Sequence, residues 1–539
     1  MNPLQVGGQV TGFSSAFVPT PIDVANIKEL ARSGVFPIQS QLSKLRTTIS
    51  AAPAELGRYD VEIERLQAAL SRLTSERSML ASYTDFCRSV LSPVQRLPNE
   101  LLANIFDLCF PENLYVIFNE ISADDEVDQL ARRYLLQLGQ VCTRWYRVAM
   151  ETPKLWSNIA VDTDAWKDYP EEDARRADLL ESSLARGRNY PLILHVGISD
   201  SDTCDVIVVE SLLRHAHRWK DVFVASSGAP CVALFSAMIN LDQLEMLDLS
   251  VSSWGQVPAF TNAPRLTSLA FSGYVDDLPL LPWTQITTIT NSVSHDFPSP
   301  SYSPVSVLNL APNLAVCTFY LDVREDFPHE PWDVQATSAV KELFFLLLTS
   351  EGDFSVVAHL FDTLTLPNLE SLDICPFDGG SPPIWSSTHF LALVERSGFD
   401  SCLTWLAIHA VVSDEELLRC LRALPKLERL FVTECRSSPA TITDNFLRGL
   451  FFVRNIASVV PKLQLLSLRC GLDFSDSVYA DLLASRTQTF DGTSAFESNL
   501  WWFEPRKREF SIEAMERINQ LVVDGGIIFN TGKYDPAVH

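Results

Sequence analysis

Between Ile38 and Val90, apolar residues recur at helical spacing and form two stripes. Pro53 separates these stripes, whose members are Ile38, Leu42, Leu45 and Ile49, then Ile63, Leu66, Leu70, Leu73 and Leu80. The second stripe fits either a coiled coil that dimerises the protein or a helical hairpin packed on its own chain. Because this stripe is shorter than the roughly three to four heptads that identify a coiled coil, residues 36–90 favour the hairpin. Residues 1–35 are rich in Gly, Ser, Thr and Pro, which indicates a mobile segment.

Residues 91–160 have the pattern of a small helical unit. Pro98 suits the first turn of a helix, where its missing N–H is not needed. The helix that follows is expected to present one broad apolar face, made of Leu101, Leu102, Ile105, Phe106 and Cys109. A second helix is expected to carry a single stripe, made of Leu138, Val141, Cys142, Trp145 and Ala149. Trp156 lies in a turn that would fold back over this core.

A repeated pattern, apolar-x-x-apolar-x-apolar, occupies the chain from Trp219 onward. Its copies begin at Trp219, Leu244, Leu266, Ile286, Leu314, Val340, Leu369, Leu403, Leu427 and Leu463. The spacing is irregular, from 20 residues between Leu266 and Ile286 to 36 residues between Leu427 and Leu463. Each copy predicts a short strand that buries alternate apolar residues, and neighbouring copies must stack to cover those faces. An α/β sheet with irregular spacing is the alternative.

The segments around these copies predict helices, a further strand and a cap. Helical spacing covers Glu171 to Arg186, Asp414 to Leu424 and Asp476 to Arg486. The segment Pro191-Leu-Ile-Leu-His-Val predicts a strand ahead of the first copy. The stretch from Phe510 to Leu521, with the apolar run that follows it, is expected to close the array.

In each predicted strand, the residues that alternate with the core positions must point outward. Parallel stacking would line them up on one concave surface, the usual binding face of such arrays. Aromatic residues beside Arg are favoured at interfaces, so we expect a target-binding site made of Tyr320, Phe344, Trp405, His409, Arg429, Phe431 and Arg469. The alternative is that these aromatic side chains only pack against one another as cross-strand neighbours.

Composition and missing motifs narrow the class of protein. The chain has 67 acidic and 42 basic residues and a net charge of −25, which argues against nucleic acid as a general partner. Eleven scattered cysteines without a Cys-x-x-Cys pair favour buried thiols in a reducing compartment, the cytoplasm or nucleus. No apolar run approaches the roughly 20 residues of a membrane span. The sequence has no Gly-x-Ser-x-Gly, His-Glu-x-x-His or Walker loop, so we predict no catalytic, metal or cofactor site.

The segment from Leu97 to Trp156 resembles the F-box, the helical module that docks substrate receptors onto the Skp-type adaptor of cullin–RING ubiquitin ligases. The resemblance rests on Leu-Pro-x-Glu-Leu at Leu97, Val-Cys-x-x-Trp at Val141 and the Leu-Trp pair that ends at Trp156. It implies an adaptor-binding surface made of Leu97, Pro98, Glu100, Leu101, Ile105, Val141, Cys142, Trp145 and Trp156. An acidic insert, Pro111 to Gln137, departs from the compact family pattern.

The repeats look like degenerate leucine-rich repeats, and the order of parts is similar to F-box-like proteins of mushroom-forming fungi. We therefore expect an α/β chain with a mobile segment at 1–35, a helical hairpin or coiled coil at 36–90, an all-α F-box at 91–160 and a leucine-rich-repeat solenoid with a cap at 161–539. The resemblance implies a non-catalytic receptor that binds a Skp-type adaptor, cullin through it, and an unknown protein target. The alternative is a protein-interaction scaffold whose F-box is vestigial. Neither function requires a cofactor, nucleic acid or a membrane.

Overall fold

The computed structural model describes residues 21–109, 116–117, 137–163, 173–198, 204–226, 239–251, 258–272, 278–292, 304–323, 335–349, 356–376, 382–434, 440–453, 458–487, 495–503 and 510–533. The chain divides into two compact units, residues 1–102 and 103–539. Residues 1–20 of the predicted mobile segment and most of the predicted acidic insert lie outside the described residues.

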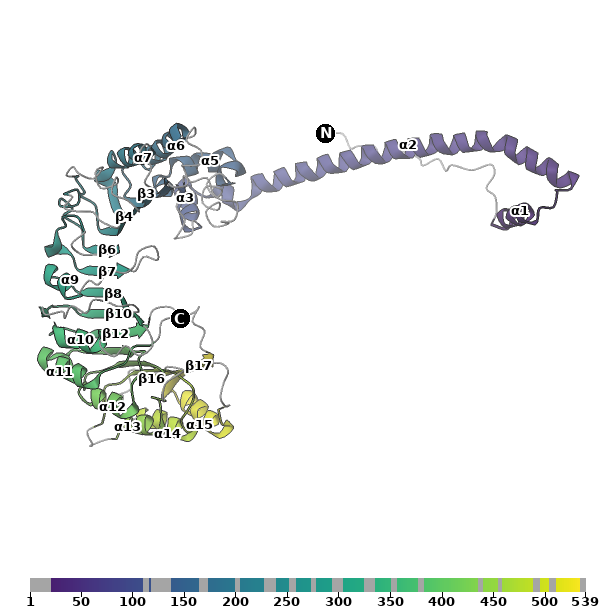
Figure 1. Ribbon diagram of the computed structural model, residues 1–539. Helices are drawn as coiled ribbons and strands as arrows, with labels where there is room; N and C mark the ends of the chain where they lie inside the picture. The colour runs from purple at the N-terminus through teal and green to yellow at the C-terminus, as the bar shows by residue number, and fades with distance from the viewer. Residues whose placement is uncertain are drawn as a thin grey trace. The chain divides into compact units, whose positions relative to one another are not determined.

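The described part of the first unit is helical. α1 spans Pro21–Ser33, α2 spans Gln39–Leu91, and a 3-10 helix, η1, spans Pro93–Arg96. Figure 1 shows α2 as one unbroken helix, and it contains Pro53. The hairpin expected over residues 36–90 is therefore wrong, and the coiled coil stays a prediction. The alanines on both sides of Pro53 are strong helix formers, which favours continuation despite the hydrogen bond that proline removes.

Short helices follow in the segment that leads into the sheet. α3 spans Asn99–Leu108, residues 137–141 form a helical turn, α5 spans Thr143–Glu151, and the 3-10 helix η2 spans Pro153–Trp156. Cys142 has an extended backbone with φ −165° and ψ 166°, and its Sγ accepts a hydrogen bond from the Trp145 N–H at 3.5 Å. The single second helix expected here is therefore wrong, because Cys142 separates two helical segments and caps the start of the second.

Among the described residues, fifteen parallel strands form one sheet in chain order. They are β1 (Val116–Ile117), β2 (Asn158–Asp162), β3 (Leu192–Ile198), β4 (Trp219–Ser226), β5 (Met246–Val251), β6 (Ser268–Ser272), β7 (Thr288–Ser292), β8 (Val316–Val323), β10 (Glu342–Thr349), β12 (Ser371–Pro376), β13 (Trp405–Ile408), β14 (Arg429–Thr433), β15 (Leu465–Cys470), β16 (Phe496–Trp502) and β17 (Ile527–Lys533). β9 (Ala336–Thr337) and β11 (Leu364–Thr365) pair separately. Because β1 and most of β2 lie within 91–160, that range is not all-α as expected.

The repeat pattern coincides with this sheet. The first copy begins at the first residue of β4, and each of the other nine begins two residues before a strand. Every starting residue of a copy is buried. The copies also align across strands, since Leu406 lies opposite Leu430, and Leu430 opposite Leu466. The predicted in-and-out alternation is confirmed, for example, on β13, where Leu406 and Ile408 are buried while Trp405 and Ala407 are only partly buried.

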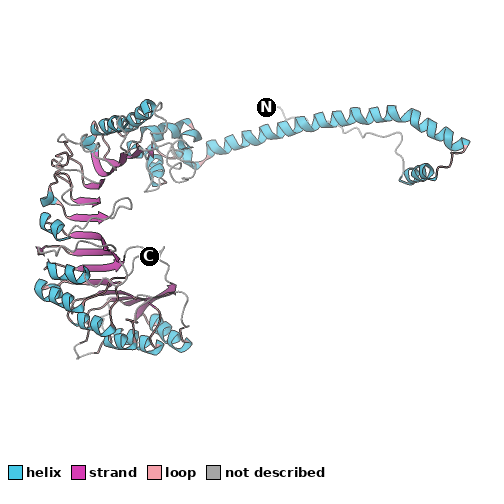
Figure 2. Cartoon of the chain, in the orientation of Figure 1, coloured by secondary structure: helices cyan, strands magenta, loops and turns pink. Residues whose placement is uncertain are grey.

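Helices cover one face of the sheet, as Figure 2 shows. The elements that follow the early strands are α6 (Asp173–Arg186), α7 (Cys204–Leu213), η5 (Ala216–Arg218), η7 (Trp283–Gln285) and α9 (Pro304–Leu310). The later ones are α10 (Val356–Thr363), α11 (Ser387–Ser397), η8 (Phe399–Ser401), α12 (Asp414–Arg422), α13 (Asp444–Gly449), α14 (Asp476–Arg486) and α15 (Ile512–Val523). Successive helices from α10 to α15 contact each other. A helix is about 10 Å wide, whereas neighbouring strands lie only about 4.8 Å apart. The wider helices therefore take the convex side of the sheet.

Arginine side chains hold the ends of these helices. Arg486 on α14 donates hydrogen bonds to the carbonyl of Leu450, at the end of α13, and at 2.9 Å to that of Val460. Burial lowers the pKa of Arg486 to about 10. Arg396 on α11 likewise donates to the carbonyl of Leu364, just after α10, at 3.0 Å. These side chains pair carbonyl groups that a helix leaves without partners at its C-terminus.

Candidate functional site

The short helices between residues 99 and 156 are held by a small aromatic core. The rings of Phe106 on α3 and Trp145 on α5 lie with centroids 4.9 Å apart. The Trp156 Nε1–H donates to the Ala149 carbonyl at 2.9 Å, which fixes η2 against α5. The Lys154 ammonium lies 2.6 Å from an oxygen of Asp107, and this hydrogen bond raises the pKa of Lys154. The helices are therefore positioned by contacts that leave their outer surfaces available.

α3 carries two apolar faces where one was expected. Leu102 and Phe106 are buried, each with 1% of its surface exposed. Leu101 and Ile105 lie one turn apart on a different face and are 49% and 41% exposed, and Leu108 is 83% exposed. Val141, at the end of the preceding helical turn, is also exposed, at 58%. Leu101, Ile105 and Leu108 form what we call the α3 outer strip, a row of large apolar side chains that the chain's own core does not cover.

The remaining predicted adaptor-binding residues differ in exposure. Pro98 and Glu100 are exposed, and Leu97, Cys142 and Trp145 are partly buried. Trp156 is buried, and the Arg186 guanidinium lies 4.8 Å from the centre of its ring. Trp156 therefore stabilises the unit from inside and is not part of its surface.

On the sheet face opposite the helices, an aromatic stack connects β13 and β14. Trp405 and Phe431 lie with ring centroids 4.5 Å apart and planes 23° from parallel, and the Arg429 guanidinium lies 5.5 Å from the Trp405 ring centre. Trp405 and Arg429 occupy opposite positions of the two strands, which brings the cation over the ring. The Trp405 Nε1–H is buried and has no hydrogen-bond partner among the described residues.

A polar group lies on the same face. Burial raises the pKa of Asp373 on β12 to about 6, although a hydrogen bond with Cys375 and the charge of Arg469 oppose this shift. Burial, and then the charge of Arg469, lowers the pKa of His409 to about 4, so this imidazole is neutral at neutral pH. Burial raises the pKa of the Cys375 thiol to about 12, which argues against a nucleophilic thiolate. The arrangement is suited to hydrogen bonding with a ligand.

The structure brings five of the seven predicted target-binding residues together. We call Trp405, His409, Arg429, Phe431 and Arg469 the β13–β15 face. Phe344 on β10 lies opposite Asp373, two strands before β13, and Tyr320 lies one strand further away, opposite Leu346. These two residues extend the row and do not join the stack. Sequence reasoning did not place Cys375 in a site, although it follows Asp373 at the two-residue step of an outward face.

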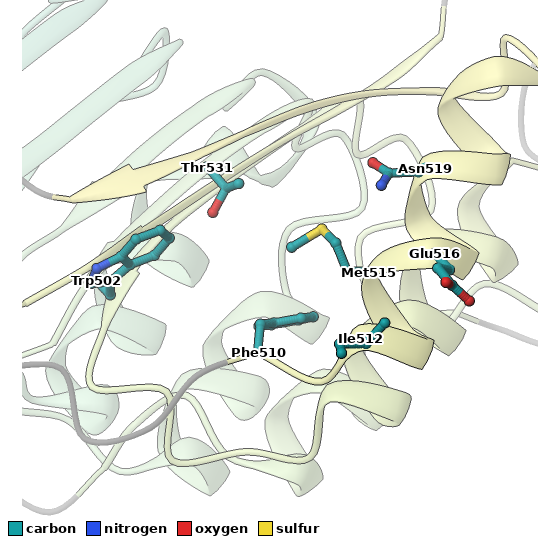
Figure 3. Close-up of a pocket in the computed structure, with 7 residues that line it drawn as sticks. All are labelled: Trp502, Phe510, Ile512, Met515, Glu516, Asn519 and Thr531. Carbon is teal, nitrogen blue, oxygen red and sulfur yellow. The ribbon is translucent and has the colours of Figure 1, made fainter.

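A hollow of about 420 Å³ lies at the C-terminal end of the sheet. Figure 3 shows the side chains that surround it, from β16, β17, α15 and the segment just before α15. The lining residues are Trp502, Phe510, Ile512, Met515, Glu516, Asn519 and Thr531. Its wall is mainly apolar, with Glu516, Asn519 and Thr531 as polar groups. Sequence reasoning assigned this region only to the closing cap.

Among the described residues, no group of three or more His, Cys, Asp or Glu side chains is arranged to hold a metal ion. Within the same residues, no helix combines the length and apolar character needed to cross a membrane. His215, which the sequence places two residues from His217, lies 3.2 Å from a carboxylate oxygen of Glu181 on α6.

Comparison with known proteins identifies one domain. Residues 94–162 match the model of the F-box-like family. This range contains α3, α5, η2 and β2, so the α3 outer strip belongs to an F-box-like domain. A comparison with curated proteins gives no match.

Proposed function

We propose that this protein is the substrate-recognition subunit of a Skp–cullin–F-box ubiquitin ligase. In this function the F-box-like domain binds a Skp-type adaptor, the sheet binds a protein target, and the other subunits supply the ubiquitin chemistry. The receptor itself is then non-catalytic and acts by raising the concentration of its target near the charged carrier enzyme.

The F-box-like match at residues 94–162 is the observation that carries this proposal. F-box domains generally bind Skp-type adaptors, and the α3 outer strip supports such a contact. Large apolar side chains that remain exposed beside a packed core mark a surface for a partner. Val141 of the family-like Val-Cys-x-x-Trp motif is exposed as well, which adds a further apolar contact.

The target side of the proposal rests on the sheet. Parallel strands at irregular spacing, with buried and mostly apolar residues at the same positions of each copy, are consistent with degenerate leucine-rich repeats. The order of parts is similar to F-box-like proteins of mushroom-forming fungi. The β13–β15 face combines stacked aromatic rings, an arginine and a buried indole N–H without a partner among the described residues. Tryptophan and arginine are the residues that most often dominate binding energy at interfaces.

Co-purification of the full chain with a Skp-type adaptor tests the function. We expect a stable complex that also contains cullin when all subunits are present. A folded chain that captures no adaptor would contradict the ligase function and leave the scaffold with a vestigial F-box.

A triple variant, Trp405→Ala with His409→Ala and Phe431→Ala, tests the target side. All three side chains are only partly buried, so we expect loss of target capture with adaptor binding and thermal stability retained. Tyr320→Ala with Phe344→Ala is the matched control on the same sheet face and should reduce capture less. If the triple variant unfolds, these residues hold the sheet and the assignment of the β13–β15 face is wrong.

A further inference from the structure

We infer that α2 forms a parallel, in-register, two-stranded coiled coil with α2 of a second copy of the chain. The inference starts from the continuity of α2 through Pro53. With the helix unbroken, the two apolar stripes of the sequence fall on a single path. From Leu42, alternate steps of three and four residues reach Leu91, and only Arg77 and Thr84 on this path are not hydrophobic residues.

The path is long enough for a stable coiled coil. From Leu42 to Leu91 it covers 49 residues, or seven heptads, whereas roughly three to four heptads suffice to identify one. The stripe that follows Pro53 is too short on its own. Joining the two stripes therefore depends on the observed structure, since the proline in the sequence indicates a break.

The described residues leave most of this path exposed. No residue of α2 is buried. Leu42 and Leu45 are partly buried, whereas the large aliphatic side chains of the path from Ile49 onward are exposed, from 48% at Ile63 to 71% at Ile49. Isolated helices are marginally stable in water, and most helices in proteins depend on packing of an apolar face. A helix with a repeated row of exposed leucines therefore requires a partner.

The geometry of the path selects a helix as that partner. A strict seven-residue repeat drifts by about 20° per heptad around a straight helix, so seven heptads wind the apolar row by roughly 140°. A flat surface of a globular domain contacts only part of such a row. A second helix that supercoils with α2 in the left-handed sense stays in contact along its whole length.

The choice of residues favours a parallel pair of identical helices. In heptad notation, Leu42 is an a position and Leu45 a d position. Leucine is the commonest residue at both positions, and the β-branched residues of the path, Ile49, Ile63 and Thr84, are all at a. β-branched residues at a with leucine at d favour parallel dimers, and a single charged residue at a, here Arg77, restricts the register.

Charges beside the path do not oppose this pairing. Glu55 and Glu62, at g positions, make ion pairs within the helix with Arg58 and Arg65, at 2.9 and 2.7 Å. The hydrogen bond with Arg65 lowers the pKa of Glu62. Each of these carboxylates thus has a cation on its own helix, on the side away from the seam.

The pairing has a consequence for the rest of the chain. α2 ends at Leu91 and the F-box-like match begins at residue 94. In a parallel pair, the two F-box-like domains therefore begin side by side. In an antiparallel pair, 53 residues at about 1.5 Å each would separate those starting points by about 80 Å. If the proposed ligase function holds, a parallel dimer presents two adaptors and two target faces together, which raises avidity for a target with two sites. The dimer itself does not depend on that function.

Light scattering of the full chain tests the dimer. We expect a mass twice the 60.2 kDa of one chain at micromolar concentration. Leu66→Lys with Leu73→Lys, both at d positions, should halve this mass, because two charges would enter the seam of each helix. Ser71→Lys with Ser78→Lys adds the same charges at exposed b positions and should leave the dimer intact. A single-chain mass for the unmodified protein, or a dimer that survives the Leu66 and Leu73 changes, would overturn the inference.

Cys87 tests the orientation. It is an exposed free cysteine at a d position near the C-terminal end of α2. In a parallel, in-register pair it faces Cys87 of the second copy, within the Cα separation of about 7 Å that a disulfide requires. Mild oxidation should therefore yield a covalent dimer that Cys87→Ser abolishes and Cys109→Ser retains. A dimer by mass without a Cys87 cross-link would contradict the parallel arrangement. Adaptor capture is measured separately, so failure here leaves the proposed function untouched.

Discussion

α2 and α12 are both regular helices, but different interactions hold them in place. α12 has nine residues; Ser413 caps its N-terminus, with Glu416 completing a capping box, and four of its side chains are buried against the sheet. α2 has 53 residues, none of them buried, and Ile38 provides no side-chain cap. Helix length is therefore no measure of how well a helix is stabilised within the chain. The helices on the sheet are stabilised by their own unit, whereas α2 depends on a partner.

Deleting one large apolar side chain in each region should give the largest contrast. Phe361 on α10 is buried and packs on Trp385 and Phe390, with ring centroids 5.2 and 5.5 Å away. Phe361→Ala should lower the free energy of unfolding of the sheet unit by about 3–5 kcal/mol. Leu70→Ala lies in α2, outside the sheet unit, and should change the unfolding free energy of that unit by less than about 0.5 kcal/mol. Urea unfolding followed by tryptophan fluorescence measures both, and equal effects would remove the contrast.

Acid should affect the two regions differently through His409. Its pKa is lowered to about 4 in the folded chain, against about 6.5 when unfolded, so the unfolded chain binds the proton first as pH falls. As the pH falls from 6.5 to 4, this should lower the unfolding free energy of the sheet unit by about 3 kcal/mol. Asp373, with its pKa raised to about 6, acts in the opposite sense, because protonation relieves a buried charge.

Comparison with His409→Asn isolates the histidine, since Asp373 is present in both chains. As the pH falls from 7 to 4, the unfolding free energy of the variant should rise by about 3 kcal/mol relative to that of the unmodified chain. A difference in unfolding free energy that stays constant over this range would show that His409 is as accessible to protons when folded as when unfolded.

Helix caps should give the smallest effects, and in opposite directions. Ser413→Ala removes the cap of α12 and should lower the stability of the sheet unit by about 1 kcal/mol. Ile38→Ser would give α2 the cap that it lacks and should raise helix content near its start. Circular dichroism and urea unfolding measure the two changes. If Ile38→Ser lowers helix content, the start of α2 is not where the structure places it.

The sheet was predictable from the sequence because its signal is local. Mostly apolar residues at fixed positions of each copy mark the strands, and all ten copies start at or just before one. α14 was predicted with its exact bounds, since Asp476 begins it and Arg486 ends it. β16 was missed because the segment Phe496–Trp502 lacks the leucine pattern of the copies, and its pairing with β15 is long-range.

Other features depended on information that no local pattern contains. Pro53 indicates a break in any window of sequence, and only the continuity of the whole helix shows otherwise. At Cys142, an extended backbone separates residues that a helical period places on one stripe. The charge of Arg469 reaches Asp373 and His409 only because the strands are stacked in register, so this grouping appears only with the fold.

The adaptor affinity of the α3 outer strip tests the account most directly. Calorimetric titration of a Skp-type adaptor into the full chain should give a measurable dissociation constant. Leu101→Ala with Ile105→Ala should weaken it at least a hundredfold, since apolar anchors at interfaces often cost about 2 kcal/mol or more each. Both side chains are exposed, so the fold should be retained, and Leu280→Ala with Leu310→Ala removes two similarly exposed leucines elsewhere as a control. Unchanged affinity in the Leu101 and Ile105 variant, or no binding by the unmodified chain, would contradict the account.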